Sequence, residues 1–219
     1  MSIQQLISPA VPILVPDDTG EHALAIMDEN ALPQLPLVSG DNYMALVQEH
    51  DLLDWNHAGD ELSKAGFLNY KPAILAVAHP FEALRLAHQM NLSVLPVVDK
   101  EHKYVGSVTK DDLLKYITEN SGIDAPGGII VLEVAPRNYT LYEIARICEN
   151  EDVTIMNLQV HPNDLGMLEV TLKLNRTAID PVVASFERYN YHVKEVYGDE
   201  SSNDDITGKY NLLMNYINM

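Results

Sequence analysis

A duplicated pattern constrains this chain more than any other feature of its sequence. Leu35-Pro36 recurs sixty positions later as Leu95-Pro96. After a slip of one residue, Asp51-Leu52-Leu53 recurs as Asp112-Leu113-Leu114. Duplication at this spacing indicates two copies of one structural unit.

Each copy predicts a short strand, an amphipathic helix, two further strands and a closing helix. The short strands are expected at 13–15 and 74–77, and the first helices at 23–30 and 81–90. A unit of this length is too small to bury its own sheet, so we expect the copies to pack against each other.

The stretch from Val105 to Leu114 predicts a strand, a tight turn and the first turn of a helix. Gly106 allows a close approach of the backbone, and Thr109 is a good N-cap residue. Asp112 lies three residues further on, near the positive end of the helix dipole. A hydroxyl at a helix N-terminus suits a phosphate, and a carboxylate suits a sugar diol. The simpler alternative is a capping box.

The first copy departs from this pattern. It has Ala45 where the second has Gly106 and Gln48 where the second has Thr109, and only Asp51 remains. We therefore expect one working site, in the second copy.

These residues resemble a CBS-domain pair, or Bateman module, over about residues 5–120. The resemblance rests on the β-α-β-β-α unit, the strand Leu95-Pro96-Val97-Val98-Asp99 and the Gly106-x-x-Thr109-x-x-Asp112 element. It implies two clefts related by a pseudo-twofold axis that take adenosine-containing ligands, here AMP, ADP, ATP or S-adenosylmethionine. It assigns phosphate and ribose contacts to Thr109 and Asp112, beside Gly106. Weaker candidates are His79, Pro96, Asp51 and Gln48.

A second domain is expected after residues 121–128, a Gly- and Pro-rich stretch typical of a linker. The CBS pair is thus predicted over 1–120, with units at about 5–60 and 72–119, and the second domain over 129–198.

Within that second domain the sequence predicts a strand at 129–134, a turn, and a helix from Leu141 capped by Thr140. Strands at 153–160 and 168–174, a helix at 179–189 and a strand at 192–197 follow. The order β-α-β-β-α-β predicts a ferredoxin-like sheet with two helices on one face. The predicted fold class is thus α/β and α+β, with tandem CBS units before this domain.

This order resembles an ACT-like domain. The turn after its first strand, Ala135-Pro136-Arg137-Asn138, lacks the glycine usual in amino-acid-binding members, so we expect dimer contact as its role. A CBS pair followed by an ACT-like domain is also similar to acetoin-utilisation AcuB-type proteins.

The end of the chain, 199–219, predicts an acidic linker and a short amphipathic helix. The apolar residues that share one helical face are Ile206, Tyr210, Leu213, Met214 and Ile217. We expect this helix to dock on its own chain or on a dimer mate rather than on an external partner.

The net charge of −18 argues against binding to nucleic acid or to an anionic membrane. No apolar run approaches the roughly 20 residues that cross a bilayer. The start of the chain does not resemble a signal peptide, and Cys148 is the single cysteine, so a cytoplasmic location is expected.

No catalytic motif or metal-ligand spacing is found, so we expect neither an enzyme nor a metal site and no required cofactor. Two hypotheses remain. The first is a homodimeric regulatory sensor that binds an adenosine-containing ligand and relays the change to a protein partner or across the dimer. The second is a structural protein assembled through the ACT-like domain and the C-terminal helix.

Overall fold

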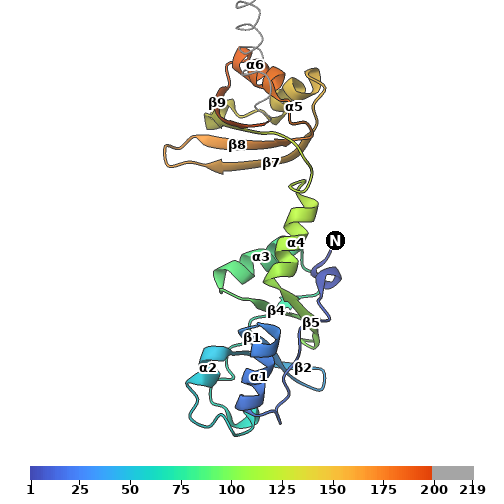
Figure 1. The fold of residues 1–219 in the computed structure, drawn as a ribbon, viewed down its shortest axis with the longest axis vertical. Coiled ribbons are helices and arrows are strands. Elements are labelled where there is room, and N and C mark those ends of the chain that lie inside the picture. The colour runs from blue at the N-terminus through green and yellow to red at the C-terminus, as the bar shows by residue number, and fades with distance from the viewer. Residues whose placement is uncertain (199–219) are drawn as a thin grey trace, which may run out of the picture. The chain divides into compact units, whose positions relative to one another are not determined.

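The structure, a computed structural model, describes residues 1–198 and divides into two units (Figure 1). The first unit comprises Met1–Ile117, and the second begins at Thr118. The C-terminal residues 199–219, with the predicted acidic linker and amphipathic helix, lie outside the described residues.

The first unit contains both copies of the duplication, in the predicted order of elements. The first copy consists of α1 (Gly20–Asn30), β1 (Gln34–Ser39), β2 (Asn42–Gln48) and α2 (Glu49–Leu53). The second consists of β3 (Ile74–Leu75), α3 (Pro80–Gln89), β4 (Val94–Val98), β5 (Tyr104–Thr109) and α4 (Lys110–Asn120). Two short 3-10 helices, η1 (Ile3–Leu6) and η2 (Leu62–Lys64), complete the unit.

The duplication extends to an irregularity in the strand pairing. The hairpin β1-β2 shifts register between Leu37 and Val38, and the hairpin β4-β5 shifts between Val97 and Val98. These are equivalent positions, sixty residues apart in the sequence. The two copies therefore share a β-bulge as well as a fold.

The short first strand of each copy is smaller than the sequence predicts. The strand expected at 13–15 is a single parallel bridge between Leu14 and Leu37. Pro12 and Pro16 flank it, and a proline cannot donate a ladder hydrogen bond. The strand expected at 74–77 is limited to β3, which pairs with β4.

The copies pack against each other by exchanging core residues. Leu46 of β2 belongs to the core of the second copy, and Val94 of β4 belongs to the core of the first. The rings of Tyr43 and Tyr104, at equivalent positions, stack with their centroids 6.5 Å apart. Burial raises the pKa of both phenols above the usual value.

The first residues of the chain complete the core of the second copy rather than the first. Ile3 is fully buried there, and its N–H donates to the carbonyl of Ala78 at 2.9 Å. Further along, Ser8 N donates to Ser107 O in β5 at 2.9 Å. We call residues 2–8 the N-terminal arm.

The second unit has the predicted ferredoxin-like topology. Its elements are β6 (Ile129–Val134), η3 (Pro136–Asn138), α5 (Leu141–Asn150), β7 (Ile155–Pro162), β8 (Leu168–Leu174), α6 (Asp180–Arg188) and β9 (His192–Tyr197). The strands form one antiparallel sheet in the order β7-β8-β6-β9, and α5 and α6 cover one face of it (Figure 1). Phe186 and Leu172 are fully buried in the core between helices and sheet.

The predicted cap at Thr140 is wrong in one respect. Thr140 is the residue before α5, but its side chain makes no capping hydrogen bond. Its ψ is 100°, whereas Thr19, whose hydroxyl does cap α1, has a ψ of 158°. Only the Thr140 carbonyl serves the helix, accepting from Glu143 N at 3.1 Å.

Candidate functional site

The predicted site residues Thr109 and Asp112 lie together where β5 passes into α4. Thr109 N donates to Asp112 Oδ2 at 2.9 Å, and Asp112 N donates to Thr109 Oγ1 at 3.0 Å. The hydroxyl of Thr109 also donates to Asp112 Oδ2, at 2.6 Å. The two residues thus form a reciprocal capping box at the start of a helix.

This arrangement limits what the two side chains offer a ligand. A hydroxyl has one proton to donate, and that of Thr109 is engaged by the Asp112 carboxylate. The second carboxylate oxygen, Asp112 Oδ1, makes no hydrogen bond within residues 1–198 and can accept from a sugar hydroxyl. A phosphate at Thr109 would have to compete with Asp112 for the same proton.

Gly106 lies in the middle of β5, and the position that its side chain would occupy points toward the N-terminal arm. A Cβ added at position 106 would overlap Cγ2 of Ile7. The close approach expected at Gly106 is therefore made by the protein's own Ile7. At the equivalent position of the first copy, Ala45 is 1% exposed and packs in the core.

Two of the weaker candidates, Pro96 and His79, have roles in the fold itself. Pro96 is buried in β4 opposite Ser107. His79 precedes α3, and its Nδ1 accepts the hydrogen bond of Phe81 N at 3.2 Å. In this tautomer His79 serves as a helix N-cap.

The first-copy candidates, Gln48 and Asp51, border the end of β2 and the short helix α2. Asp51 Oδ1 lies 3.4 Å from Nε2 of His50. A cavity of about 280 Å³ is lined here by residues of both copies, among them Gln48, Asn91 and Ser93. The structure thus provides space at the first copy, where the sequence predicts the weaker site.

Sequence reasoning missed Gln34, which connects the two copies beside this cavity. Gln34 Oε1 accepts from Ser93 N of the second copy at 2.8 Å, and its Nε2 donates to Gln48 Oε1 at 3.3 Å. Gln34 is only 7% exposed. The sequence does contain a signal for this role. A glutamine stands at the start of a mostly apolar strand, at the position where the second copy has Val94.

Residues 1–198 contain neither a cluster of metal ligands nor a helix that could span a membrane. Within residues 1–198, no group of three or more His, Cys, Asp or Glu side chains is arranged to hold a metal ion. None of the helices in this part of the chain has the length and apolar character to cross a bilayer.

Comparison with known proteins identifies the first unit. Residues 3–58 and 74–119 match the CBS domain family, so this part of the chain is a CBS-domain pair. A CBS domain-containing protein from Dictyostelium discoideum is 29% identical over 128 residues, covering 51% of this chain and 88% of the relative. Inosine-5'-monophosphate dehydrogenase from Methanocaldococcus jannaschii is 28% identical over 102 residues, covering 46% of this chain but 20% of that enzyme.

Solved structures with a similar fold also cover about half of this chain. A CBS domain pair/ACT domain protein from Thermotoga maritima has a TM-score of 0.47 at 21% identity, covering 54% of this chain and 98% of its own. CBSX2 in complex with AMP has a TM-score of 0.47 at 20% identity, covering 54% and 96% respectively.

Proposed function

We propose that the CBS pair is a regulatory sensor that binds an adenosine-containing ligand at the second copy, through Thr109 and Asp112. The observation that carries this proposal is their position at the N-terminus of α4, with Asp112 Oδ1 without a hydrogen bond among residues 1–198. The helix N-terminus favours a phosphate, and the carboxylate accepts from ribose hydroxyls. Binding involves no chemical step.

The ligand acts on the module by exchanging hydrogen bonds. A phosphate that accepts the Thr109 hydroxyl proton replaces the bond from that hydroxyl to Asp112 Oδ2, which keeps its bond from Thr109 N and gains room for one ribose hydroxyl. The first turn of α4 then responds directly to occupancy. The ligand shifts the module between two states by its difference in affinity for them, and a homodimer formed by the ACT-like domain relays this shift to a protein partner.

The test is isothermal titration of the full chain with AMP, ADP, ATP and S-adenosylmethionine. Asp112→Asn keeps an acceptor for Thr109 N–H but removes the charge that holds the ribose. Loss of a hydrogen bond to a charged group costs about 1.5–3 kcal/mol, so we expect at least roughly tenfold weaker binding. Asp51→Asn, the equivalent change in the first copy, is the control and should leave affinity unchanged. If the wild type binds none of the four compounds, the proposal is rejected.

One observation favours a second function, that of a structural protein with an unused site. Thr109 and Asp112 satisfy each other as a helix cap, so helix stability alone accounts for them. The two functions differ in oligomeric assembly: a structural protein should lose its assembly when the chain is cut after Gly198, whereas a sensor should still bind its ligand.

A further inference from the structure

The sheet of the second unit carries a cavity on the face that the helices leave open. Thr171 and Lys173 alternate along β8 with core residues such as Leu172, so their side chains lie on the opposite face of the sheet. Gln159 and Asn157 of β7 pair directly with them. Together these four polar side chains form the floor of a cavity of about 250 Å³.

The walls of the cavity come from the linker and from β6, and apart from Ser121 of the linker they are apolar. Ile123 of the linker, 55% exposed, and Ile129 of β6 line it beside the polar floor. The end of the linker is attached to β8, because Leu174 N donates to Gly128 O at 2.9 Å. At Gly127 a Cβ would overlap the carbonyl of Leu174, so only glycine allows the linker to approach this closely.

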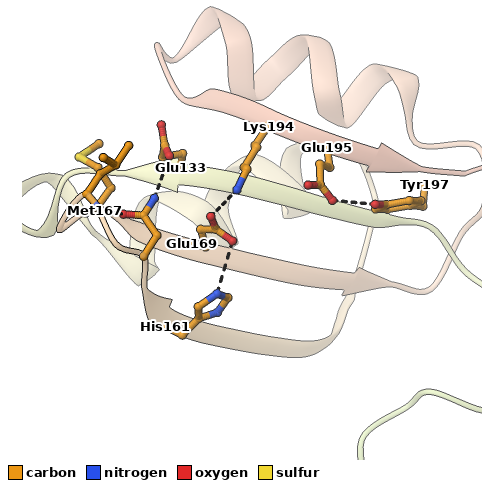
Figure 2. A network of polar contacts seen from close by, with 9 residues as sticks. Glu133, His161, Met167, Glu169, Lys194, Glu195 and Tyr197 are labelled. Carbon is orange, nitrogen blue, oxygen red and sulfur yellow. Dashed lines mark hydrogen bonds and ion pairs between the residues drawn. The ribbon is translucent and has the colours of Figure 1, made fainter.

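Lys173 differs from the other charged groups on this face. Further along the sheet, Glu169 is bound by Lys194 and lies 3.4 Å from Nε2 of His161 (Figure 2). Glu133 accepts from Asn163 at 3.0 Å. Lys173 Nζ, by contrast, donates to the carbonyl of Gly127 at 2.7 Å and has no carboxylate partner within residues 1–198.

A half-buried ammonium without a counter-ion is unusual in a chain whose net charge is −18. A buried charge is stable when it is paired, and an ammonium has three donors, of which Gly127 uses one. The side chains of Asn157, Gln159 and Thr171 likewise make no hydrogen bond with residues 1–198. The cavity therefore presents a cation and neutral hydrogen-bonding groups next to apolar walls.

We propose that this cavity binds a small organic carboxylate with an apolar body. The carboxylate pairs with Lys173 and accepts from Thr171, and the body packs on Ile123 and Ile129. No Asp or Glu lines the cavity, so an ammonium on the ligand would find no carboxylate partner there and would lie near the like charge of Lys173. The site thus favours a simple carboxylic acid over an amino acid of the same shape. It lies within the second unit and is independent of the nucleotide proposal.

Three probes of nearly equal size test this. Isocaproate has the carboxylate and the branched body, leucine adds an ammonium, and isocaproamide has no charge. Binding to the full chain is measured by isothermal titration, and the site is located by amide NMR shifts of β7 and β8. We expect isocaproate to bind, and leucine and isocaproamide to bind at least about tenfold more weakly, as an unpaired or missing charge costs about 1.5–3 kcal/mol.

Variants assign the interaction to Lys173. Lys173→Met should weaken isocaproate binding at least about tenfold, because it removes the charge-assisted hydrogen bond. Arg137→Met removes one exposed positive charge from the same unit and should leave binding unchanged. Thr171→Val removes a hydroxyl donor from the floor of the cavity and should weaken isocaproate binding less than Lys173→Met does. Circular dichroism melting checks that each variant is folded. The proposal is overturned if isocaproate does not bind, if leucine binds as tightly, or if folded Lys173→Met binds as wild type.

Discussion

Ile7 occupies the space that any side chain at position 106 would need, so the N-terminal arm adds to the preference for glycine that the φ of +156° at Gly106 already imposes. The two residues belong to segments far apart in the sequence, and Ser8 beside Ile7 is hydrogen-bonded to Ser107 beside Gly106. This contact gives Gly106 a structural role whether or not a ligand binds nearby.

Gly106→Ala should therefore destabilise the first unit. Inserting a methyl group into a filled space costs typically about 1–3 kcal/mol. Ile7→Ala should relieve the overlap, so the double variant should lose less stability than the sum of the two single variants. Urea unfolding of the four proteins measures this coupling, and strictly additive losses would contradict the contact.

Gln34→Leu should also destabilise the first unit, because it removes the acceptor of the partly buried Ser93 N–H. An unsatisfied donor costs about 1–3 kcal/mol when it is fully buried, so we expect a loss at the lower end of this range. Gln48→Ala removes only the longer contact, at 3.3 Å, and should have a smaller effect. Hydrogen exchange at the Ser93 amide should accelerate in Gln34→Leu and stay slow in Gln48→Ala. Equal exchange in the two variants would show that Gln34 does not connect the copies.

Thr109→Val should lower the free energy of unfolding by about 1 kcal/mol, the usual value of an N-cap side chain. Thr140→Val is a matched control, since Thr140 also precedes a helix but its side chain makes no capping bond. It should be nearly neutral. Thermal melting followed by circular dichroism compares the two, and a loss of similar size at Thr140 would argue against the capping box as the cause.

The pair of Glu169 and Lys194 predicts how stability depends on pH. The hydrogen bond from Lys194 holds the pKa of Glu169 below its usual value. A carboxyl whose pKa is lowered by folding stabilises the protein fully above the pKa of an unfolded Glu, about 4.3. This contribution is lost as the pH falls below that value through the lower pKa of the folded state.

Urea unfolding between neutral and acid pH tests this dependence. Glu169→Gln should flatten the loss of stability below about pH 4. Glu187→Gln removes an exposed carboxylate of the same unit and should leave the pH profile as in the wild type. Two profiles with the same slope at acid pH would remove Glu169 as the source.

Cys148 should be unreactive in the folded protein. It is 1% exposed, and burial raises the pKa of its thiol to about 11, so little thiolate exists at neutral pH. A thiol reagent should label it only after unfolding in urea. An added Leu165→Cys, at a position 82% exposed, should react at once and serves as the positive control. Rapid labelling of native Cys148 would contradict the burial.

Much of the fold could be predicted because it depends on local periodicity. The strands Leu168–Leu174 and His192–Tyr197 have the bounds that alternation and turn residues predict. The duplication also predicted that the copies pack together, and exchange of Leu46 and Val94 between their cores confirms it.

Contacts between distant segments could not be predicted in this way. Nothing local to Gly106 indicates that Ile7 lies against it, and Gln34 shows its role only when Ser93 is placed beside it. Thr109 and Asp112 were predictable as a pair, because a capping box depends on spacing alone. Whether they also bind an adenosine-containing ligand stays a prediction.

The N-terminal arm has a consequence for how this protein can be divided. The core of the second CBS domain includes buried Ile3 of the N-terminal arm as well as Leu46 of β2 and residues from Ile74 onward, although the whole first domain lies between Ile3 and Ile74 in the sequence. A fragment that starts at the second domain would lack buried Ile3 and would leave the edge beside Ser107 uncovered. The repeat seen in the sequence therefore differs from the packed unit in the structure, and recombination that exchanged the second CBS domain alone would separate it from the arm that completes its core.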